Sequence, residues 1–142
     1  KVVLSGIMAE PDEFLDIFSE FNIAVVADDL AQESRQFRTD VPSGIDPLEQ
    51  LAQQWQDFDG CPLALNPDKP RGQMLIDMTK KYNADAVVVC MMRFCDPEEF
   101  DYPIYKPEFE AAGVRYTVLD LDIESPSLEQ LRTRIQAFSE IL

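Results

Sequence analysis

The 142-residue chain contains no histidine. Without an imidazole it can form neither a Ser-His-Asp triad nor a Cys-His pair, and it offers no histidine ligand to a metal. It also lacks any apolar run close to the roughly 20 residues that a membrane span needs. The longest such run, Ala84 to Met92, is interrupted by Asp85. We therefore expect a soluble, cytoplasmic protein that contacts no membrane.

Positive charge is scarce as well. The sequence has 12 Lys and Arg against 27 Asp and Glu, a net charge of −15, which opposes binding to nucleic acid or to anionic membrane surfaces. The stretch Lys1 to Ala9 is too short, and too soon followed by acidic residues, to be a signal peptide. The start at Lys1, and not at a methionine, suggests a fragment or a processed start. The three cysteines are an odd number in a chain without a secretion signal, which favours buried, reactive or metal-bound thiols over disulfides.

Short β-branched apolar runs alternate with segments of helical spacing. The runs predict four buried strands, at Val2–Ile7, Ile23–Ala27, Ala86–Met91 and Arg115–Leu121. Apolar residues three or four apart predict helices that face a sheet, with the stripes Phe14, Ile17, Phe18 and Phe21; Leu48, Leu51, Ala52, Trp55 and Phe58; Met74, Leu75, Met78 and Tyr82; and Leu128, Leu131, Ile135, Phe138 and Leu142. This order predicts one α/β domain over residues 1–142, a three-layer αβα fold with a four-stranded parallel sheet of the Rossmann or flavodoxin type.

Capping signals mark two of the helix starts. Asp46 precedes Pro47, with a Glu three residues after the cap, and Ser127 is followed by Gln130 at the same spacing. The stretch Asp59 to Arg71, which contains three prolines, is the one long irregular segment. We expect it to be a functional loop and not a domain boundary.

Polar or sulfur-bearing residues follow three of the predicted strands, at Asp28-Asp29, Arg93 to Asp96 and Asp120 to Glu124. Ligands of open parallel sheets bind outside the carboxyl ends of the strands, so this edge is the expected site. Cys95 lies in the second group, and the Asp-Pro pair after it predicts the N-cap and first position of a helix. The positive end of that helix favours the thiolate form of Cys95, which binds metals or acts as a nucleophile.

The other two cysteines differ in their predicted surroundings. Cys90 lies inside the most apolar strand and is expected in the core, whereas Cys61 lies in the proline-rich loop. A loop thiol and a strand-end thiol could converge on one ligand, but the spacing between Cys61 and Cys95 matches no standard zinc pattern. Two thiols without a histidine cannot complete a structural zinc site. Any metal cluster would therefore need further ligands from elsewhere.

Asp28 and Asp29 permit two interpretations. A carboxylate pair at this edge can hold magnesium, as in receiver domains of signalling proteins, although no Lys ends a later strand to complete a phosphoacceptor site. The pair can also supply the N-cap of a helix through Ala31 to Gln36. The nearby cations, Arg35, Arg38 and Arg71, are expected to pair with surface carboxylates.

One motif is far more specific than these features. The segment Phe94 to Pro103, FCDPEEFDYP, resembles the 2-hydroxyglutaryl-CoA dehydratase family. The similarity extends upstream through Val26–Asp40 and Lys69–Tyr82 and downstream through Gly113–Glu124 to the final helix. The related benzoyl-CoA reductases share this layout, but the acidic DPEEFDYP run is similar to the dehydratase branch. By this resemblance the chain is the C-terminal part of a longer dehydratase subunit.

The resemblance implies a defined chemistry. Members of the family are dimers of related subunits, each with a 4Fe-4S cluster, and an ATP-hydrolysing activator protein injects one electron. They convert an (R)-2-hydroxyacyl-CoA to a 2-enoyl-CoA by syn or anti elimination of water, through a ketyl radical anion, in amino-acid fermentation. The cluster performs the difficult electron transfer. The protein supplies its ligands, sets its reduction potential and excludes water from the site. No catalytic side chain and no particular acyl group is identified.

The same resemblance assigns roles to two residues. Cys95 matches the cluster-ligating cysteine of the motif, and Cys61 falls where a second ligand is expected. The remaining ligands would lie outside this chain, so the isolated domain is expected to be inactive and to lack its cluster. An alternative is a non-catalytic domain of the same complex, which relays electrons or forms the heterodimer interface.

Overall fold

The protein contains one four-stranded sheet in which all neighbouring strands are parallel. The computed structural model describes residues 1–44, 46–64, 66–122 and 127–142. The strand order is β2-β1-β3-β4, and the strands span Val2–Gly6 (β1), Val25–Leu30 (β2), Ala86–Met92 (β3) and Arg115–Leu121 (β4). The predicted fold class is therefore confirmed.

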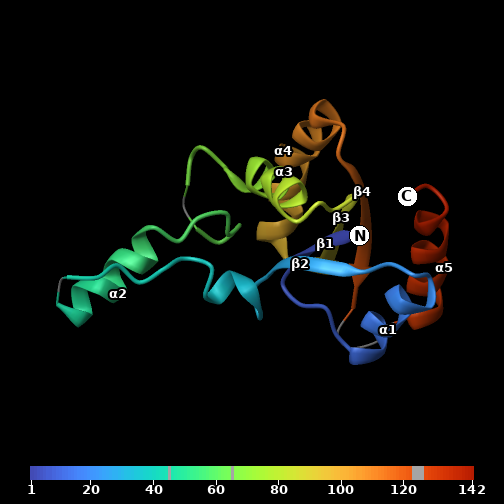
Figure 1. The fold of residues 1–142 in the computed structure, drawn as a ribbon, viewed down its shortest axis with the longest axis horizontal. Coiled ribbons are helices and arrows are strands. Elements are labelled where there is room, and N and C mark those ends of the chain that lie inside the picture. The colour runs from blue at the N-terminus through green and yellow to red at the C-terminus, as the bar shows by residue number, and fades with distance from the viewer. Residues whose placement is uncertain (45, 65, 123–126) are drawn as a thin grey trace.

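Helices cover both faces of this sheet (Figure 1). On one face, α1 (Asp12–Glu20) and α5 (Leu128–Ser139) pack against alternate residues of the strands, with Phe14 and Ile135 among the fully buried side chains. On the other face, α3 (Arg71–Lys81) and α4 (Asp96–Ala112) bury residues such as Leu75 and Phe109. The layers are those of a three-layer αβα fold. No helix in the described ranges is long and apolar enough to cross a membrane.

The local sequence explains where helices begin and end. Asp46 accepts a hydrogen bond from the backbone N–H of Leu48 at 2.9 Å and caps α2 (Pro47–Gln56), as predicted. Helix α4 ends at Gly113, whose φ of 67° lies in the left-handed region that glycine adopts without strain. At the start of α5, Ser127 occupies the N-cap, but its side chain makes no capping hydrogen bond, so the predicted capping box with Gln130 is wrong.

The second strand lies further along the chain than predicted. Ile23 packs in the core directly after α1, and β2 begins only at Val25, so that Asp28 and Asp29 lie inside the strand. The predicted helix through Ala31 to Gln36 is reduced to a short 3₁₀ helix, η1 (Ser34–Gln36). Asp28 still acts as a local cap, because its Oδ1 accepts hydrogen bonds from the backbone N–H groups of Leu30 at 3.1 Å and Ser34 at 3.0 Å.

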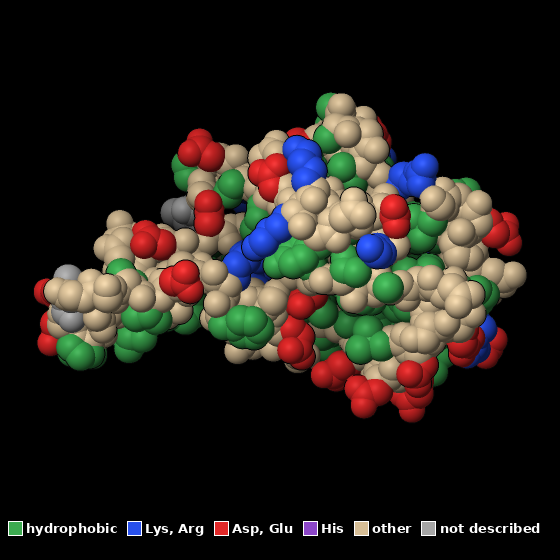
Figure 2. All heavy atoms as spheres, viewed as in Figure 1, with side chains coloured by type: hydrophobic (Ala, Val, Ile, Leu, Met, Phe, Trp, Pro, Cys, Tyr) green, Lys and Arg blue, Asp and Glu red, His purple; other side chains and the backbone are tan. Residues whose placement is uncertain are grey.

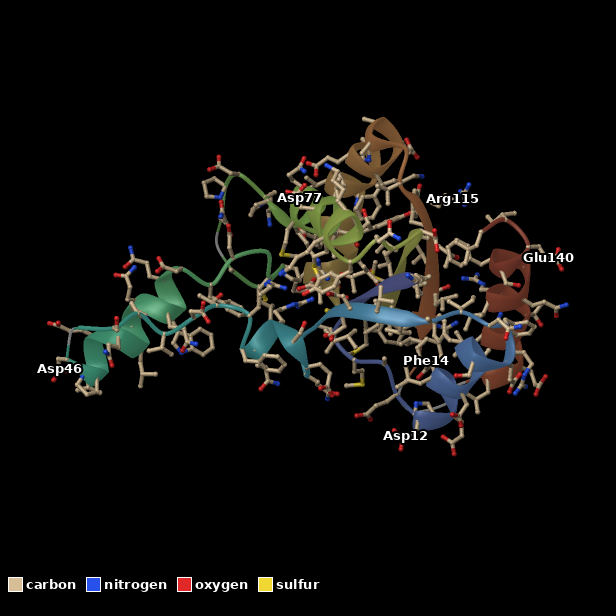
Figure 3. All side chains as sticks on the ribbon, in the orientation of Figure 1. Asp12, Phe14, Asp46, Asp77, Arg115 and Glu140 are labelled. Carbon is tan, nitrogen blue, oxygen red and sulfur yellow. The ribbon has the colours of Figure 1, made fainter. Side chains whose placement is uncertain are left out.

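Helix α2 does not face the sheet. Its apolar stripe points to solvent, with Leu48 78% and Trp55 72% exposed, and the helix has no buried residue. It projects from the body on a segment that we term the arm, residues 37–58 without residue 45 (Figure 1). Figure 3 shows Asp46 at the outer tip of the arm, far from Phe14 under the sheet. The prediction that this stripe packs on the sheet is wrong, because the arm leaves the body between η1 and α3.

Candidate functional site at the carboxyl edge of the sheet

Cys90 belongs to the core and not to the site. Its side chain in β3 is fully buried among the apolar residues beneath the sheet, as the sequence predicted. Burial raises the pKa of its thiol to about 12, and the nearby Glu98 carboxylate adds to the rise. The thiol is therefore neutral at physiological pH, the form that neither binds metals nor attacks electrophiles.

Cys95 lies where the sequence placed it, between the end of β3 and the start of α4. It occupies the N-cap itself, so the predicted N-cap, Asp96, is the first helical residue. Its carbonyl oxygen accepts hydrogen bonds from the N–H groups of Glu98 and Glu99, both at 3.0 Å. The preceding Phe94 has a φ of 65° and a side chain that is 92% exposed. A bulky residue in the left-handed region is strained, and such strain is common next to functional residues.

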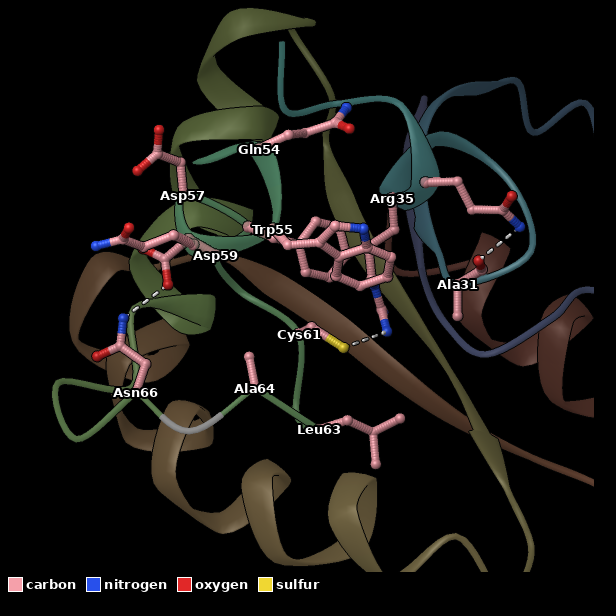
Figure 4. A pocket seen from close by; sticks show the side chains of 13 residues that line it. Ala31, Arg35, Gln54, Trp55, Asp57, Asp59, Cys61, Leu63, Ala64 and Asn66 are labelled. Carbon is pink, nitrogen blue, oxygen red and sulfur yellow. Dashed lines mark hydrogen bonds between the residues drawn. The ribbon is translucent and has the colours of Figure 1, made fainter. Parts of the chain in front are cut away.

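Cys61 lies in the loop that follows the arm. Its half-buried Sγ is 3.9 Å from Nη1 of Arg35, and Figure 4 shows the thiol directed toward that guanidinium. The two residues line a groove of about 1020 Å³ together with apolar side chains of the arm and the loop, among them Trp55, Phe58 and Leu63. Arg35 thus places a positive charge next to the Cys61 sulfur, while Cys95 lies at the amino end of α4, whose first turn also carries three carboxylates.

A buried network of charges lies beside these cysteines. Arg35 and Arg71 are only 1% and 2% exposed, so the expectation that they pair with carboxylates on the surface is wrong. Both contact the buried carboxylate of Asp29, with Arg35 Nε at 3.2 Å from Oδ1 and Arg71 Nε at 3.5 Å from Oδ2. Arg38, a quarter exposed, also donates to Asp29 and holds the carbonyl oxygen of Asp59 at 2.8 Å. Because its oxygens are bound by arginines, Asp29 is not available as a magnesium ligand.

The network extends into the first turns of α4. Arg71 donates to Glu98 Oε1 and to Ser5 Oγ, both at 2.9 Å, and lies 3.9 Å from Asp101 Oδ2. Burial alone lowers the pKa of Arg71, but Asp29 and Glu98 outweigh it and hold that pKa above its ordinary value. The sequence reasoning missed Glu98 and Asp101 as buried partners. Their signal is the acidic run of the FCDPEEFDYP motif, in which both residues follow Pro97.

Several buried polar atoms of the network lack a hydrogen-bond partner in the described part of the chain. They are Nε and Nη1 of Arg71, Oε2 of Glu98 and Oδ1 of Asp101. Each side chain nevertheless lies near an opposite charge, such as Lys69 Nζ at 3.3 Å from Asp101 Oδ1. The network therefore relies on charge attraction at ion-pair distances as well as on hydrogen bonds.

In the third predicted group, Asp120 and Asp122 each form an ion pair. Asp120 pairs with Arg134 at 3.2 Å on the exposed surface of β4 and α5, and Asp122 lies 3.4 Å from Arg93. Ile123 and Glu124, also part of that prediction, lie outside the described residues. The polar groups that come together lie at the carboxyl ends of β1, β2 and β3. In the sheet, β2 and β3 lie on opposite sides of β1, and ligands of such sheets bind where the strand order changes direction.

Two of the three free cysteines, Cys61 and Cys95, are partly exposed. Among the described residues, no three Cys, Asp or Glu side chains are grouped closely enough to hold a metal ion. The residues present would fit at most a part of a cluster-binding site, to which this chain would contribute two thiols. The full set of ligands would have to be completed by other residues.

Comparison with known proteins gives consistent results. The model of the family described as 2-hydroxyglutaryl-CoA dehydratase, D-component, matches residues 1–142. The chain is 54% identical over 143 residues to the lactoyl-CoA dehydratase subunit beta of Anaerotignum propionicum and 44% identical over 142 residues to the (R)-phenyllactyl-CoA dehydratase beta subunit of Clostridium sporogenes. It is 33% identical over 146 residues to the (R)-2-hydroxyglutaryl-CoA dehydratase subunit beta of Acidaminococcus fermentans. In each case all of this chain is matched, and it spans 38% of the relative's length.

Proposed function

This chain belongs to the 2-hydroxyglutaryl-CoA dehydratase D-component family, and from that premise we propose that it acts within the beta subunit of an (R)-2-hydroxyacyl-CoA dehydratase. The reaction would eliminate water to give a 2-enoyl-CoA through a ketyl radical anion of the thioester. The proposal is supported by the identity of 54% to a lactoyl-CoA dehydratase subunit beta. We further propose that the chain forms the C-terminal part of the longer subunit.

We propose that Cys95 and Cys61 are ligands of a 4Fe-4S cluster at the carboxyl edge of the sheet. The observation that carries this is a chain of contacts. Arg35 lies 3.9 Å from the Cys61 sulfur and 3.8 Å from Glu98 Oε1, and Glu98 is in the first turn of the helix that Cys95 caps. These contacts support the proposal that both cysteines face the same edge of the sheet. When bound, such a cluster would supply one-electron transfer.

The residues of this chain would have three tasks at that site. The two thiolates would bind iron, Arg35 would place a positive charge beside the Cys61 sulfur, and the buried network would keep the loops in place. The partners required by this proposal are a second dehydratase subunit, an ATP-dependent activator and the acyl-CoA substrate. The three relatives act on different acyl groups by their names, so the acyl group is left open.

The test is reconstitution of the complete beta subunit with iron and sulfide in the absence of oxygen. Replacing Cys95→Ala should remove most of the bound iron, and with the second subunit and activator present it should abolish dehydration. The matched control is Cys90→Ala, which should keep its iron because the Cys90 thiol is sealed in the core. Wild-type iron content in the Cys95→Ala subunit would exclude Cys95 as a ligand.

The exposed apolar face of α2 favours a second candidate function, in which this domain chiefly forms the interface with the other subunit. The arm presents Leu48 and Trp55 to solvent, and residues 39–68 contain no Lys or Arg. Figure 2 shows apolar and acidic side chains along it. Under this reading, the double replacement Leu48→Ala and Trp55→Ala weakens association with the second subunit, while Cys95→Ala leaves iron content unchanged.

A further inference from the structure

Arg35 contacts several parts of the carboxyl edge of the sheet, although the sequence predicted only that it pairs with carboxylates on the surface. Its Nη2 donates to the backbone carbonyl oxygens of Gly6 at 2.8 Å and Asp29 at 2.7 Å, at the ends of β1 and β2. The same Nη2 lies 3.8 Å from Glu98 Oε1 in the first turn of α4. Its Nη1 reaches the Cys61 sulfur at 3.9 Å. One buried guanidinium therefore connects two strand ends, a helix start and a cysteine.

The carboxylates explain why a full positive charge is stable at this position. Asp29 and Glu98 are both buried and both within ion-pair distance of Arg35, and Asp29 also accepts from its Nε at 3.2 Å. A planar guanidinium with several fixed N–H donors can satisfy these groups at once, which a Lys ammonium cannot do with the same geometry. The direction of the remaining Nη1 toward Cys61 is thus set by the other contacts.

We propose that Arg35 is a positioning residue that holds Cys61 against the start of α4 and tunes the electrostatics of the sulfur. The inference rests on the proposed assignment of Cys61 as a cluster ligand. A positive charge that donates toward a ligating sulfur favours the reduced, more negatively charged cluster. Removal of that charge should therefore shift the reduction potential of the cluster to more negative values, and loss of the fixed geometry should weaken iron binding.

Arg38 provides a matched control for Arg35. It contacts the same Asp29 carboxylate, and its second nitrogen holds the carbonyl oxygen of Asp59 at 2.8 Å. Both arginines thus support the same loop, but the contact with the Cys61 sulfur is made by Arg35. If Arg35 served only to stabilise the fold, replacements of the two arginines would affect the cluster alike.

The experiment uses the complete beta subunit reconstituted with iron and sulfide, in the variants Arg35→Met, Arg35→Lys, Arg38→Met and Cys61→Ala. The readouts are iron affinity and the midpoint potential, followed by electron paramagnetic resonance during a redox titration. We expect Arg35→Met to bind iron roughly 10-fold more weakly, as for other groups that orient a metal ligand, and to have a more negative potential. Arg38→Met, which loses a contact to the loop but none to the sulfur, should keep the wild-type potential and lose less iron affinity than Arg35→Met. Arg35→Lys should have a potential between those of Arg35→Met and Arg38→Met.

The outcomes separate two kinds of failure. If Cys61→Ala loses iron while Arg35→Met keeps the wild-type affinity and potential, the role of Arg35 is refuted and the cluster assignment stands. If Cys61→Ala keeps its iron, the assignment of Cys61 is refuted and the role of Arg35 with it. If Arg35→Met does not fold by circular dichroism, the decision falls to Arg35→Lys, where an unchanged potential overturns the inference and a negative shift supports it.

Discussion

Two helices of this protein have the same spacing of apolar residues, but one is buried against the sheet and the other is exposed to solvent. In α1, Phe14 and Ile17 are fully buried under the sheet, whereas in α2 Leu48 and Trp55 are mostly exposed on the arm. Both stripes follow the three-to-four residue period of an amphipathic helix. The period shows that a helix forms and which of its faces is apolar. It does not show what covers that face, which depends on where the chain leads the helix.

The surroundings of the two helices follow from their connections. Helix α1 connects adjacent parallel strands, β1 and β2, and a short crossover of this kind returns the helix onto the sheet. Helix α2 lies in the long segment between β2 and α3. The next helix, α3, packs against the sheet, so α2 is not needed to cover it. The arm is thus free to extend. Arg38, near its start, contacts Asp29 of β2, whereas the hydrogen bond from Gln54 Nε2 to the carbonyl oxygen of Thr39, at 2.8 Å, lies within the arm itself.

The largest expected effect contrasts these two helices directly. Phe14→Ala should lower the free energy of unfolding by about 3–5 kcal/mol, because it removes a fully buried ring and leaves a cavity. Leu48→Ala on the arm should change it by no more than about 0.5 kcal/mol, as for other exposed positions. Chemical denaturation of both variants measures the difference. Equal losses would show that the arm packs on the body in solution.

A smaller effect is expected where α3 packs on α4. A Cβ at Gly72 would lie 2.7 Å from the Tyr105 Cβ and 1.9 Å from the Glu108 carboxylate. Gly72→Ala should therefore destabilise the protein by about 1–3 kcal/mol, although alanine is the better helix former. The control is Gln73→Ala in the same turn, which is exposed and should have little effect. A stabilised Gly72→Ala protein would mean that the two helices can move apart freely.

The buried thiol of the body gives a pH dependence. Cys90 has a pKa of about 12 when folded, against 9.0 as the ordinary value, so the folded state retains its proton when the unfolded state loses it. Stability from this group is complete below pH 9 and is lost as the pH rises toward 12. The slope is roughly 1.4 kcal/mol per pH unit at most. Cys90→Ala should flatten the fall of the unfolding free energy in this window. An unchanged slope would place the thiol in contact with water.

The smallest effect concerns an exposed residue of the body. The side chain of Phe94 is exposed, like the apolar side chains of the arm, but its backbone adopts the left-handed conformation next to Cys95. Phe94→Gly should relieve this strain and gain up to about 1 kcal/mol. Phe94→Ala keeps a Cβ and should gain nothing. If both variants have the same unfolding free energy, the backbone of Phe94 is not strained.

The comparison also shows how far sequence reasoning can go. Strands β3 and β4 are local apolar runs, and their predicted ends agree with the structure to within one residue. Cys95 was placed correctly because strand end and helix start adjoin in the chain. The buried partners Asp29 and Glu98 were not predicted, since their pairing with Arg35 and Arg71 depends on which loops meet in space. A charged residue is exposed by default, and only long-range geometry can overrule that expectation.

The central claim is that Cys61 and Cys95 serve one cluster, and a double replacement tests it most directly. Iron bound per complete subunit is measured for Cys61→Ala, Cys95→Ala and the double variant after the same reconstitution. If the two cysteines bind one shared cluster, the Cys95→Ala variant already lacks that cluster. The double variant should then bind as little iron as Cys95→Ala alone, and not less. Losses that add up, or a Cys61→Ala variant with all of its iron, would contradict a shared site.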